Sequence, residues 1–259
     1  MSFFSNLRRA FGGQEASDGR LQFRSQPPMP EFDDDAPLPG TLLTEAESLR
    51  ATEWLRLSLT KFGYPVSAFV PGHFAAYARI YHPFVDPGSR TLGDPERHTW
   101  KTVVGRQLPE TPHDAADIAM RGAPTGQAPT GCAPRHLVEA LAAALATQTT
   151  TPKDCCFAVW EGFGDLQFSP RHRPTLRLPQ RAYHVFAGEL ARVAEASGYS
   201  TISFSYRSPN LWWPADHAWC VATEIDHAWT YVAGSRACVD SLLSDARLEA
   251  AETSADAAW

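Results

Sequence analysis

The sequence predicts an α+β protein, with a mainly antiparallel or mixed sheet covered by helices and a flexible N-terminal tail before it. Strand-like segments follow one another with only single helices between them, unlike the regular βαβ alternation of a parallel sheet. Apolar residues make up 44% of the 259 residues and aromatic residues 11%, which is enough for a large core. We expect one globular domain over residues 41–259, with a candidate seam at the glycine- and proline-rich residues 122–133.

The tail, residues 1–40, combines prolines between positions 27 and 39 with an acidic run at 33–35. Such a composition cannot bury enough apolar surface to offset the entropy lost on ordering, so we expect flexibility. Near its start, four apolar side chains fall on one helical face beside two arginines. This pattern suits a turn docked on its own domain or an amphipathic contact with a membrane surface or a partner. The four residues are Phe3, Phe4, Leu7 and Phe11.

Three helices carry the clearest signals. Thr44 and Glu47 have the spacing of a capping box ahead of the apolar run 49–59, which a glycine and a proline end. Pro134 opens a second helix, in which leucine and alanine repeat at helical spacing up to residue 145. We expect a third helix at residues 236–243 and shorter ones at 97–107, 115–120 and 189–196.

The strand signals are short apolar or alternating runs bounded by turn residues. Residues 74–81 alternate alanine and isoleucine on one face with tyrosine and arginine on the other. Pro71 and Gly72 suggest a hairpin that joins this run to a strand at residues 66–70. Further strands are expected at residues 155–160, 175–178, 182–186, 201–206, 218–225 and 230–232.

Charge and cysteine usage restrict the class of protein. The formal charge of −6 disfavours a broad phosphate-binding face, so nucleic acid is not expected as a partner. The five cysteines are odd in number and scattered, which favours reduced thiols over a disulfide scaffold. No run approaches the ~18 apolar residues that cross a bilayer, and residues 1–12 lack the apolar centre of a signal peptide. We therefore expect a soluble cytoplasmic protein.

No motif with a defined chemistry stands out. The patterns of phosphate-binding loops, dinucleotide folds, hydrolase elbows and paired-cysteine zinc sites are all missing from the sequence. Cys155 and Cys156 would point to opposite faces of a strand, and Cys220 would share a face with alanines rather than with His217. These thiols are expected in the core, and the sequence indicates no catalytic residue, no metal and no cofactor.

The most unusual stretch is residues 208–219, where three tryptophans fall within eight positions. As a proline-bounded loop it would expose an aromatic anchor of the kind that dominates binding hot spots. Alternatively, it would fold back as a lid over the sheet, with an aspartate capping a turn through its side chain. The residues expected to contact a partner here are Arg207, Trp212, Trp213, Asp216 and Trp219.

A second polar and aromatic set lies around the expected hairpin. It consists of Tyr77, Arg79 and His82, with His73 beside them. These side chains would line the wall of a pocket or form an ordinary solvated strand face, and the sequence leaves both interpretations open.

Two segments carry a resemblance to known proteins: residues 74–83, FAAYARIYHP, and residues 211–226, LWWPADHAWCVATEID. Through them the chain resembles a family of uncharacterised soluble proteins of high-GC bacteria, over most of the region from Val66 to Glu249. The resemblance implies no activity, so no residue takes a catalytic role from it.

Two function classes remain. The first is a non-catalytic binding or protein-interaction module that uses the aromatic loop, because the catalytic templates are missing from the sequence. The alternative is an enzyme of unknown type whose pocket gathers residues distant in sequence. The residues considered for such a pocket are His82, Arg207, Asp216 and Glu224.

Overall fold

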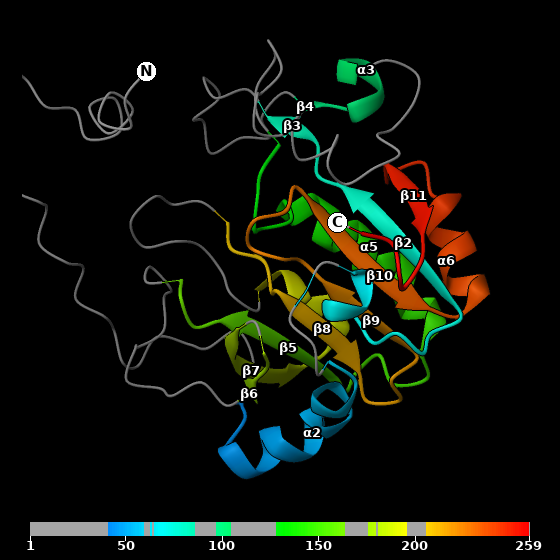
Figure 1. Ribbon diagram of the computed structural model, residues 1–259. Coiled ribbons are helices and arrows are strands. Elements are labelled where there is room, and N and C mark those ends of the chain that lie inside the picture. Colours follow the sequence, from blue (N-terminus) through cyan, green and yellow to red (C-terminus); the bar gives the residue numbers. More distant parts are fainter. Residues whose placement is uncertain are drawn as a thin grey trace, which may run out of the picture. The chain divides into compact units, whose positions relative to one another are not determined.

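The computed structural model describes residues 41–59, 63, 65–85, 97–104, 128–163, 176–179, 181–195 and 206–258. A nine-stranded sheet forms its centre, and the neighbouring strands pair antiparallel throughout (Figure 1). The predicted α+β class with an antiparallel sheet is therefore confirmed. The predicted tail with Phe3, Phe4, Leu7 and Phe11, and the predicted helix at 115–120, lie outside the described residues.

The strand order across the sheet is β1-β7-β5-β8-β9-β10-β2-β11, with β6 paired to β7, so neighbours in space are often distant in sequence. A separate two-stranded ladder joins β3 to β4. The strand bounds are β1 Thr41–Leu42, β2 Ala76–Tyr81, β3 Phe84–Val85, β4 Arg97–His98, β5 Cys155–Trp160, β6 Leu176–Arg177, β7 Ala182–Gly188, β8 Leu211–Pro214, β9 Trp219–Ala222, β10 Trp229–Gly234 and β11 Ala250–Thr253.

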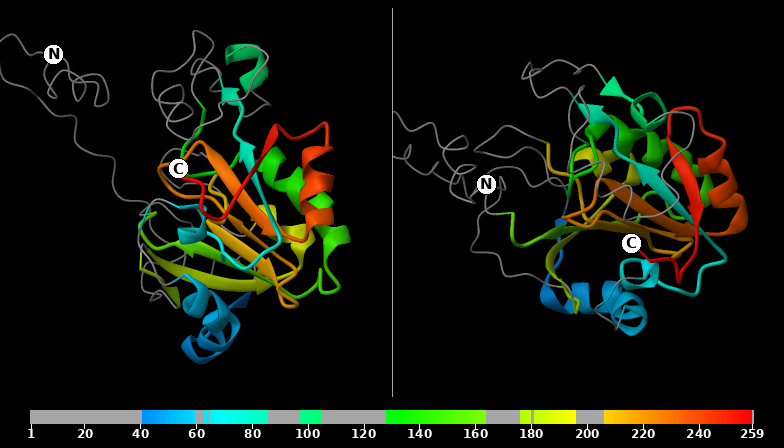
Figure 2. Two further views of the ribbon diagram at one scale, coloured as in Figure 1. Left: turned by 45° about the vertical axis from the view of Figure 1, so that its right-hand side comes forward. Right: turned by 45° about the horizontal axis from the view of Figure 1, so that its top comes forward.

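Helices cover both faces of the sheet, as the right-hand view of Figure 2 shows. Leucines and valines of α5, α6 and η3 pack on one face, while α2 and the short turn η1 pack on the other. We call the second face the α2 face. The helix bounds are α2 Glu45–Ser58, α3 Trp100–Val104, α5 Arg135–Leu145 and α6 Arg236–Leu243, and the 3-10 turns are η1 Val66–Ala68, η2 Ala146–Gln148 and η3 Leu190–Glu195.

The capping box at the start of α2 is present as predicted. The Glu47 carboxylate accepts from the Thr44 N–H at 2.9 Å, and the Thr44 hydroxyl accepts from the Glu47 N–H. The helix buries Ser48, Thr52 and Leu55, so its inner face is partly polar, and Leu57 remains 73% exposed. The packing face of α2 is therefore not a continuous apolar stripe.

The strand register aligns one residue from each central strand across the α2 face. Residues in such a row are cross-strand neighbours, separated by about 4.7–4.9 Å between adjacent strands. The row, which we call the central row, runs from β5 to β11 through Ala158, Leu211, Ala222, Tyr231, Arg79 and Ala251.

The tryptophan-rich stretch is a central strand, so the expectation of an exposed aromatic loop is wrong. Residues 211–214 pair with β5 on one side, and Leu211 and Trp212 pair with β9 on the other. Pro214 is the last residue of the strand and lies beyond the part that pairs with β9. Successive side chains of a strand point to opposite faces of the sheet. Trp212 therefore packs against Trp219 on the face covered by α5, which we call the α5 side, and Trp213 packs against Trp54 on the α2 face. Trp212, Trp213 and Trp219 are each at most 1% exposed.

Three further element predictions change in the structure. Val66–Ala68 is a 3-10 turn rather than a hairpin strand, because the N–H groups of Val66 and Ser67 donate to the chain's own C-terminal segment, at Ala257 and Ala255. The predicted helix at 97–107 begins as the strand β4 and becomes α3 only at Trp100. The predicted helix at 189–196 is the 3-10 turn η3.

Among the described residues, no helix combines the length and the apolar character that a membrane span requires.

The burial of Trp213 generates a stability prediction. Trp213→Ala should lower the free energy of unfolding by about 3–5 kcal/mol, because it removes a fully buried indole and leaves a cavity. Leu57→Ala is the control, since this side chain is 73% exposed and its loss should cost no more than about 0.5 kcal/mol. Denaturant titration followed by circular dichroism measures both, and a small loss for Trp213→Ala would contradict the core position.

Candidate functional site

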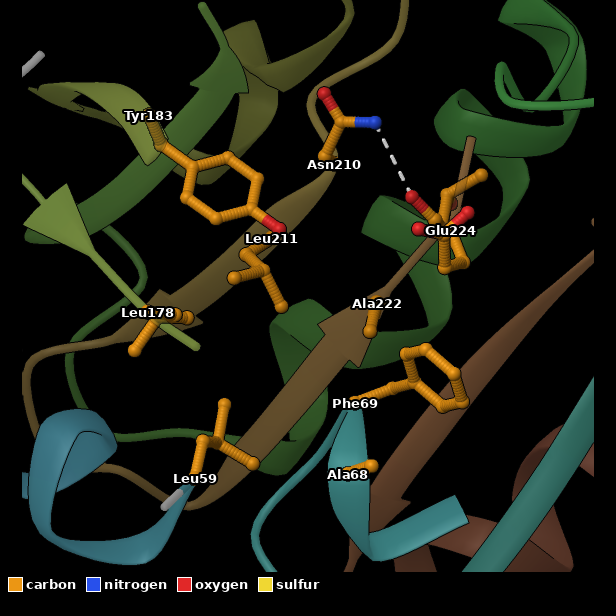
Figure 3. A pocket seen from close by; sticks show the side chains of 10 residues that line it. Leu59, Ala68, Phe69, Leu178, Tyr183, Asn210, Leu211, Ala222 and Glu224 are labelled. Carbon is orange, nitrogen blue, oxygen red and sulfur yellow. Dashed lines mark hydrogen bonds between the residues drawn. The ribbon is translucent and has the colours of Figure 1, made fainter. Parts of the chain in front are cut away.

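A hollow opens on the α2 face above β8 and β9 (Figure 3). Most of its wall is apolar, while the side where β9 ends is polar. The apolar wall comes from Leu59, Ala68, Phe69, Leu178, Leu211 and Ala222, and the polar side from Tyr183, Asn210, Thr223 and Glu224.

The volume of this hollow limits what it can hold. It is about 20 Å³, enough for roughly one water molecule. Pockets that enclose whole metabolites usually measure about 300–1,000 Å³. The hollow therefore suits one small chemical group rather than an entire substrate.

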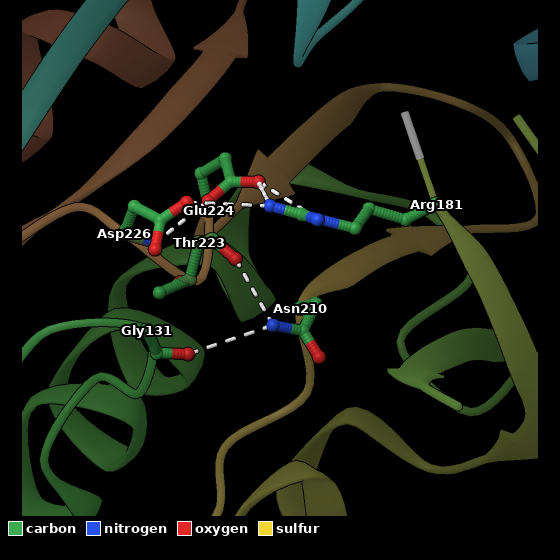
Figure 4. Close-up of polar contacts among 6 residues, drawn as sticks. All are labelled: Gly131, Arg181, Asn210, Thr223, Glu224 and Asp226. Atoms are coloured by element: carbon green, nitrogen blue, oxygen red, sulfur yellow. Dashed lines mark hydrogen bonds and ion pairs between the residues drawn. The ribbon is translucent and has the colours of Figure 1, made fainter. Parts of the chain in front are cut away.

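Asn210 holds the polar side of the hollow together (Figure 4). Its side-chain oxygen accepts from the Trp160 N–H at 2.9 Å, and its side-chain nitrogen donates to the carbonyls of Thr223 at 3.1 Å and Gly131 at 3.5 Å. Its main chain also bonds to Ala158 and Thr223. A single 3% exposed amide thus ties the ends of β5, β8 and β9 to the loop before α5.

Arg181 and Glu224 form an ion pair at the rim. The Arg181 guanidinium donates to one Glu224 oxygen from Nε at 3.0 Å and from Nη2 at 2.7 Å, while the other oxygen accepts from the Asp226 N–H at 2.7 Å. Arg181 also lies over the Trp160 ring at 5.3 Å. Both carboxylate oxygens are occupied, so Glu224 serves as an anchor for Arg181 rather than as a free base.

Tyr183 supplies the polar group that remains available. Burial raises the pKa of its hydroxyl, and the negative charge of Glu224 raises it further, so the group stays protonated at neutral pH. Figure 3 shows the hydroxyl directed into the hollow beside Leu211. It makes no hydrogen bond to another described residue, so it can donate to an incoming acceptor.

Four of the five cysteines offer no thiolate near neutral pH. Burial raises the pKa of Cys156 and Cys238 to about 11 and that of Cys155 to about 12, and it raises the pKa of Cys220 still further. Cys220 faces the α2 side with Ala222, as predicted from the alternation along its strand. These thiols pack as small apolar groups. Within the described part of the chain, no three His, Cys, Asp or Glu side chains are grouped to hold a metal ion.

Asp216 acts as the turn cap that the sequence suggested as an alternative to partner contact. Its carboxylate accepts from the Thr149 hydroxyl at 2.8 Å, from the Thr150 N–H at 2.7 Å and from the Ala218 N–H at 3.1 Å. It joins the β8–β9 turn to the segment after α5. Asp216 and Glu224 stand at opposite ends of β9, so the structure does not gather them into one pocket.

The other predicted site residues lie apart from the hollow. Arg207 lies over Phe163 at 5.0 Å, and Tyr77 donates its hydroxyl proton to the Pro71 carbonyl at 3.1 Å. His82 is buried, with Nδ1 at 2.7 Å from the Pro129 carbonyl and Nε2 at 3.0 Å from the Thr230 hydroxyl. Because a carbonyl only accepts, Nδ1 carries the proton. Of the four residues considered for an enzyme pocket, Glu224 alone lines this hollow.

Sequence reasoning missed Tyr183, Asn210 and Arg181. Asn210 lies in the tryptophan-rich stretch, directly after Pro209, so the sequence shows a polar residue there. Its hydrogen-bond partners Trp160 and Gly131, however, are 50 and 79 residues away in sequence. Tyr183 and Arg181 carry no local signal at all. Only the non-sequential strand order brings these three residues together.

The chain matches no protein-family model, no curated protein and no solved structure.

The Asp216 cap predicts a pH-dependent contribution to stability. Burial alone would raise the pKa of Asp216, but the hydrogen bonds from Thr150, Thr149 and Ala218 bring it below its ordinary value. A lowered folded-state pKa contributes stability that is present above the unfolded value of about 3.9 and is lost as the pH falls through the folded value.

We therefore expect Asp216→Asn to lower Tm by about 2 °C at pH 7 and the difference from wild type to close toward pH 3. Thermal melts of both proteins across this range measure it, with Asp240→Asn as the surface control. A difference that stays constant down to pH 3 would contradict the cap.

Proposed function

We propose that the protein is a non-catalytic binding module and that the hollow beside Tyr183 receives one small hydrogen-bonding group of its partner. The Tyr183 hydroxyl carries this proposal. Its side chain is 8% exposed, and its hydroxyl is protonated and directed into a free volume of about 20 Å³, without an acceptor among the described residues. A hydroxyl that reaches a hollow without a protein acceptor can donate its proton to a group that enters the hollow.

The surrounding residues support binding rather than chemistry. Glu224 is held by Arg181 on one oxygen and by the Asp226 N–H on the other. Tyr183 remains a neutral donor, and burial keeps Cys220, on the same face, a thiol. A general base or a nucleophile would need a freely oriented, deprotonated group close to the substrate.

A protein is the partner that fits this site best. The hollow offers a neutral donor in an apolar wall, which matches an amide or peptide carbonyl on an otherwise apolar segment. The end of α2 contributes Leu59 to the wall, and the same helix exposes Leu57 at 73% and Leu49 at 43%. These two side chains offer apolar area on α2 for a partner to cover.

N-methylacetamide, a mimic of one peptide group, tests the proposal. Titration into the full-length protein, followed by amide chemical shifts in NMR, should give saturable changes in residues around the hollow. Tyr183→Phe should weaken binding about tenfold, because it removes one hydrogen bond from a buried site. Its effect on Tm should be small, because the hydroxyl has no acceptor in the described structure to lose.

Ala222→Val supplies the second test, because it adds two methyl groups where the hollow has room for about one water. It should abolish the saturable changes. Thr147→Val, an exposed position away from the hollow, is the control and should bind like wild type. Equal binding by Ala222→Val and wild type would show that the probe does not enter the hollow.

A further inference from the structure

A second group of buried polar side chains lies on the α2 face, on the other side of Phe69 from the hollow. Phe69 lines the hollow and also stacks on Tyr231, with ring centroids 5.8 Å apart. Next to Tyr231 in the central row is Arg79, in the middle of β2. This arginine is 4% exposed, which is unusual because charged side chains are almost never fully buried without a partner.

Aromatic faces surround the Arg79 guanidinium. Its central carbon lies 5.3 Å from the centre of the Trp229 ring and 5.8 Å from the centre of the Tyr231 ring. His227 stacks on Trp229 at 4.6 Å. Contact with a ring face offsets only part of the free energy of removing a guanidinium from water. Arginine also cannot become neutral in a protein, so the charge stays.

No carboxylate in the described part of the chain pairs with Arg79. The acidic residues of the adjoining segments are each engaged elsewhere. Glu249 accepts from the N–H groups of Trp100 at 2.7 Å and Lys101 at 3.1 Å. Glu252 pairs with Arg236 at 2.8 Å, and Glu224 pairs with Arg181 at 2.7 Å. A buried positive charge therefore lacks the counter-charge that proteins normally provide.

Three buried donors in this cluster have no acceptor outside the cluster among the described residues: Arg79 Nε, Trp229 Nε1 and the Tyr231 hydroxyl. They lie close to one another: burial raises the pKa of Tyr231, and the charge of Arg79 together with side-chain interactions of Trp229 and Arg79 with the Tyr231 hydroxyl partly offsets that rise. The indole N–H groups of Trp54 and Trp219 also lack described acceptors, but no arginine lies against either ring.

The charge and shape of the cluster indicate which kind of hydrogen-bond acceptor a ligand would need to supply. Burial lowers the pKa of His227 to about 3 and that of His82 to about 4, so both imidazoles are neutral at pH 7 and Arg79 contributes a single positive charge. One charge in a low-dielectric site balances a monoanion rather than a phosphate dianion. The planar fork of a guanidinium matches the two oxygens of a carboxylate.

We propose that Arg79, Trp229 and Tyr231 form a binding site for the carboxylate of a small organic acid, with the aromatic rings of the cluster packing on its apolar part. This site is separate from the hollow beside Tyr183, and neither proposal depends on the other.

The test is the melting temperature of the full-length protein at pH 7 with acetate, benzoate and phenylacetate, at constant ionic strength. Sodium chloride and sodium phosphate serve as comparison anions. Binding to the folded state alone raises Tm with ligand concentration, and a ligand at about 100 times its Kd should raise it by about 5 °C or more. We expect the aromatic acids to act at lower concentration than acetate, and chloride and phosphate to have no such effect.

Arg79→Met separates a binding residue from a packing residue. If Arg79 binds the carboxylate, the variant should lose the rise in Tm that carboxylates cause. Without ligand it should melt a few degrees higher than wild type, because an apolar side chain replaces an unpaired buried charge. Arg192→Met, at a 58% exposed arginine, is the control and should keep the wild-type response.

Tyr231→Phe is a second, milder variant, which tests the site even if Arg79→Met does not fold. It removes one donor and keeps the ring, so it should weaken benzoate binding about tenfold by isothermal titration calorimetry. The proposal is overturned if no carboxylate raises the wild-type Tm, if Arg79→Met responds as wild type does, or if phosphate acts more strongly than the carboxylates.

Discussion

The pairing of β8 with β5 and β9 is the constraint on which the rest of the structure depends. This four-residue strand joins the group β1-β7-β5 to the group β9-β10-β2-β11, so without it the sheet would fall into two parts. Its alternation also divides the tryptophans between the two faces, with Trp212 on the α5 side and Trp213 on the α2 side. The two polar anchors, Asn210 and Asp216, flank the same strand and fix its ends.

The elements predicted best from the sequence are those whose signals are local. The capping box of α2, the helical spacing of α5 and the period-two alternation of residues 76–81 each involve neighbours within a few positions, and each is present in the structure. The tryptophan-rich strand was missed because four residues between prolines are too few to show an alternation. Its burial depends on two partner strands, and β5 lies more than 50 residues earlier in the chain.

The candidate sites were less accessible to sequence reasoning. The alternation correctly placed Tyr77, Arg79 and Tyr81 on one face of a strand, but the interpretation of that face as solvated was wrong, because Arg79 is 4% exposed. Burial there comes from neighbouring strands and from η1, whose position depends on hydrogen bonds to the C-terminal segment. Tyr183 and Asn210 meet only through the strand order, which no local pattern encodes.

The short outer strands bear on the behaviour of the protein in concentrated solution. β7, with seven residues, would present a long row of unpaired backbone groups, but β1 covers it at Phe186 and Ala187, and β6 covers it at Ala182 and Tyr183. Long exposed edges template the growth of intermolecular sheets, and short edge strands interrupt that growth. The arrangement therefore disfavours edge-to-edge aggregation between copies of the chain while leaving both faces of the sheet free for their helices.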